Sequence, residues 1–299
     1  MICGGGPRRA ARCVNLAAMN ATITQLHLFP IKGCRGIALR SATLAATGLE
    51  VDGIGDREWV IVDADGEFLS QREYPKMALI DLRMTGTSLR VKAPGMLHLE
   101  VPFDSEGDVV KARVWDDTIA AVTQGEIADA WFSSFLGTPA RLLRFDPEHT
   151  RLASHKWTGK DEAPYKFADA FPLLVASEAS LADVNARLGK AGHAAVGMER
   201  FRPNIVLAGL EAYEEDYLKQ LTVAGATVRA VKPCARCSVP GVDPATGEAS
   251  TVVPDLLATY RGRTSGPAQG VMFGVNAIVS GGAGATLRVG DAVEVELDL

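Results

Sequence analysis

Two cysteines three residues apart carry the most specific chemistry in this sequence. Cys234 and Cys237 flank an arginine in the segment Lys-Pro-Cys-Ala-Arg-Cys at residues 232–237, shortly before an Asp-Pro turn. A thiolate in this segment could bind a soft metal or attack a disulfide, and a neutral thiol could pack as a small apolar group. Arg236 would help to keep such a thiolate ionised. Spacing alone leaves the two cysteines equivalent.

Two common roles of a Cys-x-x-Cys pair fit this sequence poorly. A structural zinc site needs four ligands at paired spacings, whereas the chain has no second such pair and its five histidines are scattered. A thioredoxin-like disulfide needs the pair at the start of a helix, and Pro240 with Asp243-Pro244 opposes a helix there. A soft metal held by one thiolate and a pair of inert, buried cysteines both remain open.

Cationic side chains could complete a site for an anion. They are Lys32, in a glycine-punctuated loop after the first expected strand, Arg57 and Arg202, at the starts of expected strands, and Arg236. Such a loop can hold phosphate through backbone N–H groups and a lysine, although this one lacks the Walker pattern. The planar fork of arginine suits phosphate or carboxyl groups, and the Asn204 amide could read a heterocycle edge. Each cation alone is typical of a surface or ion-paired residue, but together they indicate a deep pocket for an anionic ligand.

Composition and charge exclude several classes of protein. The 299 residues are 47% hydrophobic, which is enough apolar material for one large or two ordinary globular domains. A net charge of −5 gives no general attraction to nucleic acid or to an anionic membrane, so we expect neither as a partner. No apolar run is long enough to predict a transmembrane helix. The few cysteines favour reduced thiols in the cytoplasm over a secreted disulfide framework, and no hydrolase motif is present.

The first half of the chain is predicted to consist of short strands and one helix. An Asp-Gly pair at residues 65–66 predicts a hairpin between strands 59–63 and 67–70. Apolar residues at positions 127, 131 and 135, followed by Gly137, predict a helix that buries this stripe. Further strands are expected at residues 77–84, 88–92, 97–101 and 109–115.

The second half resumes with strands after the polar, irregular segment 147–164. That segment is predicted to be a linker or a mobile loop over a site. A helix is expected to begin near Ser177 or Ser180 and to end at Gly189. Strands are expected at residues 173–176, 202–207, 221–223, 227–231, 271–279 and 287–297. We therefore predict a first domain at 21–145, a linker at 146–164 and a second domain at 165–299. Residues 1–20 are predicted to be a disordered extension from an upstream start.

Several segments, taken in order, resemble one family. They are residues 28–34, 48–49 with 56–59, 177–181, 201–206, and 234–237 followed by 242–247. The set is similar to MOSC-domain proteins with an N-terminal MOSC β-barrel domain, in particular the mitochondrial amidoxime-reducing component and its bacterial YcbX-like relatives. The resemblance runs from about residue 22 to the end of the chain. It implies a mixed α/β, predominantly β fold of two β-barrel-like domains with a few helices.

The resemblance also implies a molybdenum cofactor, molybdenum bound to molybdopterin, between the two domains. Cys237 matches the family cysteine that ligates molybdenum. Lys32, Arg57, Arg202 and Asn204 match residues that bind the pterin and its phosphate, and Arg236 lies beside the ligand. The chain departs from the family at Gly33 and Ala235, which replace serines, and at Ala170 and Phe171, which replace Thr-Ser. Contacts of Gly33, Ala170 and Phe171 with the cofactor would come from the backbone.

The activity that the resemblance implies is reduction of small N-hydroxylated compounds, such as amidoximes or N-hydroxylated bases. Electrons would come from a separate ferredoxin-, flavodoxin- or cytochrome b-type protein with its reductase. No cysteine follows Cys237, so the two-iron ferredoxin domain of YcbX-like proteins is expected to be absent. Polar groups in residues 151–160 could gate substrate entry. Pyridoxal phosphate binding is a further association of the family. The alternatives are a molybdopterin-binding carrier or sulfur-handling protein without reductase turnover, and a redox-active dithiol protein.

Overall fold

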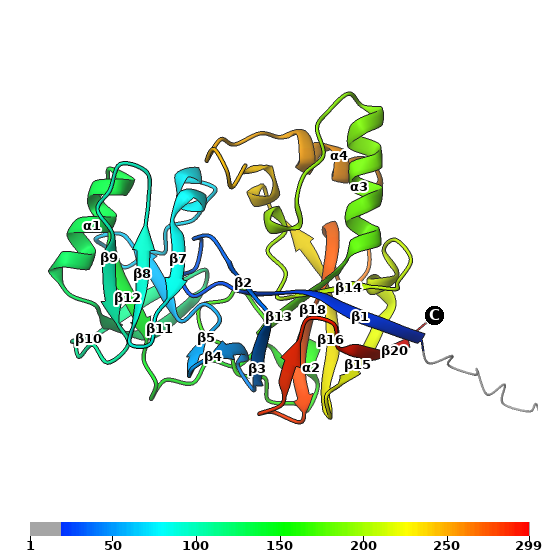
Figure 1. Cartoon of the computed structure of the whole chain (residues 1–299), viewed down its shortest axis with the longest axis horizontal. Coiled ribbons are helices and arrows are strands. Elements are labelled where there is room, and N and C mark those ends of the chain that lie inside the picture. The colour runs from blue at the N-terminus through cyan, green and yellow to red at the C-terminus, as the bar shows by residue number, and fades with distance from the viewer. Residues whose placement is uncertain (1–18, 299) are drawn as a thin grey trace, which may run out of the picture.

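The computed structural model describes residues 19–298, which form two β-rich units side by side (Figure 1). The expected extension at residues 1–20 lies outside the described residues, apart from Met19 and Asn20, which begin the first strand. None of the helices within 19–298 is both long and apolar enough to cross a membrane. The predominantly β fold is therefore confirmed, with helices confined to the periphery of the sheets.

The second unit is a barrel that closes on itself. Within the described residues, seven strands pair in the order β13, β14, β1, β20, β15, β16 and β18, and β18 pairs back with β13. Closure gives each of these strands a neighbour on both sides, so no barrel edge is left open. The strands are β13 (Leu173–Ser177), β14 (Ile205–Ala208), β1 (Met19–Leu28), β20 (Ala292–Leu297), β15 (Leu218–Val223), β16 (Ala226–Arg236) and β18 (Gly270–Gly281), with β17 (Gly262–Arg263) added to β18.

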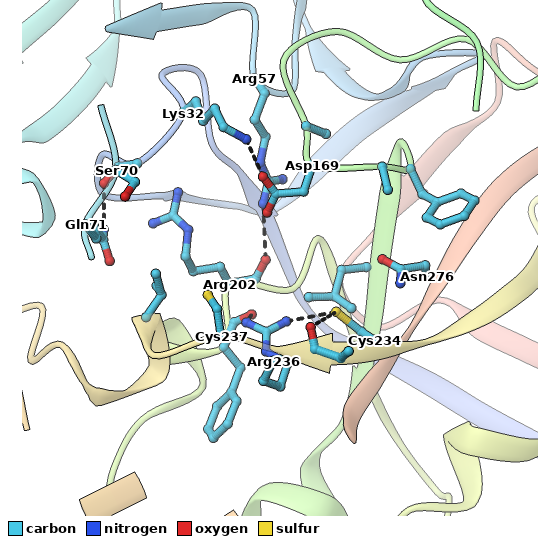
Figure 2. A pocket seen from close by; sticks show the side chains of 18 of the residues that line it. Lys32, Arg57, Ser70, Gln71, Asp169, Arg202, Cys234, Arg236, Cys237 and Asn276 are labelled. Atoms are coloured by element: carbon cyan, nitrogen blue, oxygen red, sulfur yellow. Dashed lines mark hydrogen bonds and ion pairs between the residues drawn. The ribbon is translucent and has the colours of Figure 1, made fainter. Parts of the chain in front are cut away.

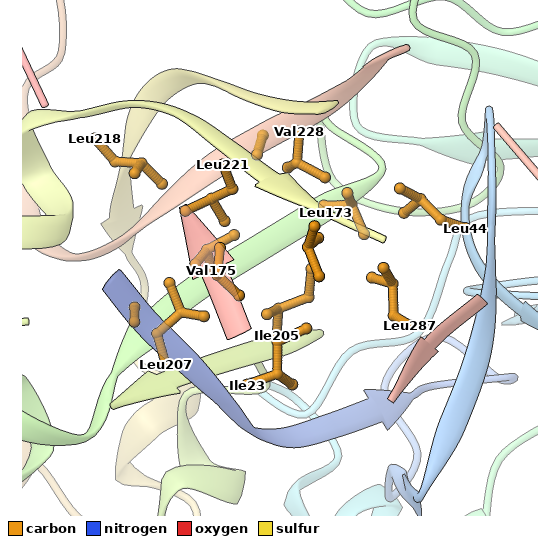
Figure 3. Packing of buried hydrophobic residues seen from close by; sticks show 14 of the residues in the cluster. Ile23, Leu44, Leu173, Val175, Ile205, Leu207, Leu218, Leu221, Val228 and Leu287 are labelled. Carbon is orange, nitrogen blue, oxygen red and sulfur yellow. The ribbon is translucent and has the colours of Figure 1, made fainter. Parts of the chain in front are cut away.

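The inward-facing side chains of alternating residues along each strand fill the barrel. In β20, Val293, Val295 and Leu297 are buried while the residues between them are partly or fully exposed, as the predicted period of two requires. These side chains join a single apolar cluster with Ile23 and Leu221, which Figure 3 shows converging from several strands. The barrel interior is therefore a packed core, and any ligand site must lie outside it.

The first unit is built from two sheets that enclose a second core. One sheet pairs β10 (Val109–Val114), β11 (Asp117–Thr123), β12 (Arg141–Phe145) and β6 (Trp59–Val62), and the other pairs β7 (Asp81–Met84), β8 (Ser88–Lys92) and β9 (Leu99–Pro102). Trp59 and Phe132 are fully buried in the core between these sheets and helix α1 (Glu126–Leu136). A further small sheet contains β19 (Thr286–Arg288), β3 (Ser41–Ala45), β4 (Gly48–Val51) and β5 (Ile54–Gly55), while β2 (Ile37–Leu39) pairs with β1.

The two units exchange strands. β1 comes first in the chain but pairs with β14 and β20 in the barrel. β19 comes near the end of the chain but pairs with β3. Alternating hydrophobicity cannot reveal this exchange, because it marks a strand without naming its partner. For the segments that are not exchanged, the predicted boundary between two domains within residues 145–165 stays a proposal.

Helix α1 lies where the sequence predicts, but only part of the predicted stripe is buried. Gly137 ends it in the left-handed conformation, with φ of 70°. Ile127 is 80% exposed, whereas Ala128, Trp131, Phe132 and Leu136 are buried. The buried face therefore includes Trp131 of the predicted stripe but is centred nearer to Phe132, on the side where the helix contacts β12 and β9.

Other boundaries also differ from the prediction. The expected strand 77–84 begins as a 3-10 turn, η1 (Pro75–Leu79), because Pro75 favours a first turn and cannot donate to a strand ladder. The expected strand 202–207 starts only at residue 205, since Arg202 has φ of 58° and Pro203 lacks an N–H group. The expected loop 147–164 contains the short helix α2 (His155–Thr158).

Helix α3 (Glu178–Lys190) begins at a buried polar cluster. The Ser177 side chain caps the helix by accepting a hydrogen bond from the Ser180 N–H group. Both serine hydroxyls donate to Oε2 of Glu215, at 3.0 and 2.7 Å, from the 3-10 turn η3 (Glu214–Tyr217). Glu215 is fully buried, and burial raises the pKa of its carboxyl above the usual range. The remaining elements are η2 (Met198–Arg200), η4 (Val239–Gly241) and helix α4 (Val252–Arg261).

Glu215→Gln is expected to flatten the pH dependence of stability. The pKa of Glu215 is raised in the folded state. At a pH just above the ordinary carboxyl pKa, the folded protein therefore still holds this proton, whereas the unfolded chain has released it. The free energy of unfolding therefore falls as pH rises through that window. Relative to wild type, the glutamine variant should gain on the order of 1 kcal/mol between pH 5 and pH 8, measured by urea unfolding. Glu178→Gln, at an exposed position, is the control, and equal pH dependence in Glu215→Gln and wild type would contradict this prediction.

Candidate active site

A pocket of about 250 Å³ is lined by residues of both units. Its walls come from the loop after β1, the turn before β6, the hairpin at residue 115, the loops before β13 and β14, and the end of β16 (Figure 2). Every site residue expected from the sequence lines this pocket: Lys32, Gly33, Arg57, Ala170, Phe171, Arg202, Asn204, Ala235, Arg236 and Cys237. Segments far apart in the chain thus converge on one cavity.

Lys32 is held at the pocket wall by an ion pair. Its side chain is mostly buried, and Nζ donates to the Phe167 carbonyl oxygen at 2.9 Å and to Oδ1 of Asp169 at 2.5 Å. Trp115 Nε1 donates to the same carboxylate oxygen at 3.1 Å. Burial lowers the pKa of Lys32. Partial desolvation at the pocket wall acts to raise the pKa of Asp169, but the charge and hydrogen bond of Lys32 outweigh it and hold that pKa below its usual range. The Asp169 carboxylate, 70% accessible, therefore stays ionised at the pocket surface.

Arg57 and Arg202 place two guanidinium groups on the same aromatic ring. The central carbon of each lies 4.4 Å from the centre of the Phe29 ring. Arg57 pairs with Asp56, and Arg202 Nη1 donates to the Cys34 carbonyl oxygen at 2.7 Å. Burial and the neighbouring charge of Arg57 lower the pKa of Arg202 to about 9, which still leaves it protonated at neutral pH. Two adjacent cations of this kind favour an anion in the pocket.

The amide of Asn204 is used within the protein. Its Oδ1 accepts from the Leu174 N–H group at 3.1 Å and from Arg57 Nη1 at 3.3 Å. Its Nδ2 donates to the His27 carbonyl oxygen at 3.2 Å, and the residue is almost fully buried. The expectation that this amide reads a heterocycle edge does not fit these contacts. Asn204 instead joins β13 to β1 and orients Arg57.

The two cysteines differ in their surroundings. β16 continues to Arg236, so Cys234 lies within the strand and Cys237 follows its end. Arg236 Nη1 donates to Cys234 Sγ at 3.2 Å, and its Nη2 donates to the Phe201 carbonyl oxygen at 2.8 Å. Figure 2 shows the two sulfurs on opposite sides of the Arg236 side chain, and both thiols are free. Cys237 is exposed to the pocket, whereas Cys234 holds Arg236 in place.

Comparison with known proteins gives the family. Residues 20–139 match the MOSC N-terminal beta barrel domain, and residues 162–294 match the MOSC domain. Mitochondrial amidoxime reducing component 2 of Bos taurus is 33% identical over 286 residues, which cover 91% of this chain and 82% of the relative. This chain belongs to the MOSC family of the amidoxime reducing components. Homo sapiens component 1 is 34% identical over 248 residues, covering 80% of this MOSC protein and 72% of the human chain.

The departures from the family pattern have a local explanation at Gly33. In this MOSC protein Gly33 has φ of 84°, in the left-handed region that favours glycine. A Cβ atom there would lie 2.6 Å from Cε of Met77. The Gly33 carbonyl oxygen also accepts from Gln71 Nε2 at 2.6 Å. The residue thus contributes backbone to the pocket, as expected for a position without a side chain.

Sequence patterns missed several residues that line the pocket of this MOSC protein. Asp169 directly precedes Ala170 and Phe171 in the sequence, but nothing in its spacing linked it to Lys32. The others lie on hairpins and strands whose convergence depends on the tertiary fold. These residues are Phe68, Gln71, Arg72, Trp115, Asp169, Lys232 and Asn276.

Arg151, from the predicted gating segment, has a structural role in this MOSC protein. It is almost fully buried, and it donates to Oδ2 of Asp117 at 2.9 and 2.6 Å. Its Nη1 also donates to the carbonyl oxygens of Lys166 and Ala168, both at 2.8 Å. Arg151 therefore fastens the loop before β13 to the β10–β11 hairpin. No residue of 151–160 lines the pocket, so the gating role expected of this segment stays a prediction without support from the pocket lining.

Proposed function

We propose that this protein binds a molybdenum cofactor in the pocket and reduces small N-hydroxylated compounds, such as amidoximes. The observation that carries the proposal is the convergence of Cys237 with Lys32, Arg57 and Arg202 on one cavity. The names of the relatives supply the reaction class, since they describe amidoxime-reducing components.

The donor set fits a phosphate-bearing group that carries a soft metal. Among the described residues, Asp169 is the only acid that lines the pocket, whereas six cationic residues line it: Lys32, Arg57, Arg72, Arg202, Lys232 and Arg236. Nε of Arg236 is buried without a hydrogen-bond partner within residues 19–298, so a donor is left for a ligand. No cluster of three metal-binding side chains exists in that part of the chain. A metal at Cys237 would therefore need most of its ligands from a cofactor, as a molybdenum–dithiolene group provides.

Each residue has a defined task in this proposal. Cys237 would supply the thiolate for the metal. Lys32, Arg57 and Arg202 would hold the phosphate and the pterin, while Asn204 orients Arg57 and Arg236 borders the metal ligand. Gly33, Ala170, Phe171 and Ala235 would offer backbone groups. When bound, the metal supplies the two-electron chemistry, and the protein binds, orients and shields the substrate.

The electrons are proposed to come from a separate ferredoxin-, flavodoxin- or cytochrome b-type protein with its reductase. We further propose a cytoplasmic location. The three cysteines among the described residues are all free thiols, as is usual in a reducing compartment.

Metal analysis combined with an activity assay tests the proposal. The protein is purified from hosts with and without a functional pterin-cofactor pathway, and molybdenum content and amidoxime reduction by reduced methyl viologen are measured. We expect about one molybdenum per chain and activity from the competent host only. Lack of molybdenum from the competent host would refute the cofactor assignment. Bound molybdenum without turnover of any amidoxime would favour a carrier.

A further inference from the structure

The β10–β11 hairpin places an unusual residue at the mouth of the pocket. Val114 pairs with Asp117, so Trp115 and Asp116 form a two-residue turn. Trp115 has φ of 58°, a conformation that hairpin turns normally reserve for glycine, asparagine or aspartate. A bulky side chain there costs of order 1 kcal/mol or more. Its side chain is also 44% exposed, so burial does not repay that cost in full.

Backbone strain is concentrated at this pocket. Six non-glycine residues within 19–298 have positive φ, and three of them, Arg57, Trp115 and Arg202, line the cavity. The other two pocket residues in this group carry the cations of the proposed cofactor site. Strained residues persist where the surrounding structure fixes them and commonly mark functional positions. Trp115 therefore shares with Arg57 and Arg202 both a strained backbone conformation and a place in the pocket lining.

The indole is fixed in position by the neighbouring loop before β13. Its Nε1 donates to Asp169, and the hairpin is tied to the same loop through the Arg151–Asp117 ion pair. One end of the indole is thereby fastened, while the ring remains accessible. A rigid aromatic side chain loses little conformational entropy when it binds a ligand.

Two further side chains extend the indole into an aromatic surface. The Phe68 ring meets Trp115 edge to face, with ring centres 4.8 Å apart. The Arg72 guanidinium lies 4.4 Å from the Trp115 ring centre, and a planar guanidinium can itself stack on a flat ligand. All three residues line the pocket that also contains Cys237.

We propose that Trp115, with Phe68 and Arg72, binds the planar aromatic part of the N-hydroxylated substrate and so selects aromatic over aliphatic compounds. The identity of the reacting N–OH group rests on the proposed function. Binding of the aromatic ring does not depend on it. Trp115 acts through contact with the substrate ring, and the cofactor is held by other residues. Loss of the indole should therefore weaken binding of an aromatic ligand without loss of metal.

Benzamidoxime and acetamidoxime test this proposal, because they share the N–OH group and differ in the phenyl ring. Trp115→Gly is the informative variant, since glycine accepts the positive φ and should not impair folding. Calorimetric titration of the molybdenum-loaded protein is expected to show a Kd for benzamidoxime about 10-fold higher than in wild type. The Kd for acetamidoxime and the molybdenum content should stay within about twofold. KM for benzamidoxime should rise while kcat stays nearly constant.

Trp115→Phe keeps an aromatic ring and removes the bond to Asp169, so it should retain most of the affinity. Tyr217→Ala, at an exposed aromatic position outside the pocket, is the matched control and should leave both Kd values unchanged. An unchanged Kd for benzamidoxime in Trp115→Gly, an equal rise for both compounds, or a loss of molybdenum would each overturn the proposal. Wild-type protein that binds benzamidoxime through Trp115 but reduces neither compound would refute the proposed function and leave the aromatic site standing.

Discussion

Cys237→Ser should lose nearly all molybdenum and at least about 100-fold of the amidoxime-reducing activity, measured per chain on protein from a cofactor-competent host. The thiol of Cys237 is exposed to the pocket just after β16 ends. A serine hydroxyl is a hard, weakly acidic donor and replaces a thiolate poorly at a soft metal. Metal content by elemental analysis separates loss of the ligand from loss of chemistry alone.

Cys234→Ser is the matched control for that result. Cys234 accepts a hydrogen bond from Arg236, and a serine oxygen can accept the same bond. We expect its activity and molybdenum content to stay within about threefold of wild type. Equal losses in the two variants would contradict the assignment of Cys237 as the single ligand and favour a mechanism that needs both thiols.

Lys32→Met should lower the affinity for the cofactor by about 10- to 100-fold. A hydrogen bond to a charged group is worth about 1.5–3 kcal/mol, and methionine keeps most of the buried side-chain volume while it removes the charge. The substitution also leaves the Asp169 carboxylate without its ammonium partner. Pterin content and molybdenum content of purified protein should fall together.

The double variant Lys32→Met/Asp169→Asn separates two causes of that loss. Unpaired Asp169 would repel a phosphate, and asparagine removes that repulsion while keeping an acceptor for Trp115. We expect the double variant to bind more cofactor than Lys32→Met but less than wild type. No difference between the double and single variants would show that Asp169 does not repel the bound anion.

The local signals in the sequence were strongest where short-range geometry decides the structure. Gly137 and the apolar residues before it located α1, and the serines at 177 and 180 located the start of α3 to within three residues, because caps and helical periodicity act over short distances. The same signals did not choose which side of α1 is buried. Ile127 proved exposed, since that choice depends on the strands against which the helix packs.

These local signals could not predict which strands pair over long sequence distances. The residues of β1 pair with residues of β14 that lie 179–186 positions later and with residues of β20 that lie 270–276 positions later. β19 completes a sheet with β3. The position of Asp169 against Lys32 depends in turn on how Arg151 fastens the loop before β13. Such contacts join residues that no periodicity relates.

The sequence by itself determined the residue types of the candidate site and, through family resemblance, the reaction class to be tested. It identified the cations Lys32, Arg57, Arg202 and Arg236 and a pair of cysteines in which only the family resemblance favoured Cys237. Only the tertiary structure decided their environments. It separated an exposed Cys237 from an Arg236-bound Cys234, and it brought Trp115 to the pocket. The physical reason is that the residue type sets the intrinsic chemistry of a side chain. Packing between segments sets its exposure, its hydrogen bonds and its distance from other charges.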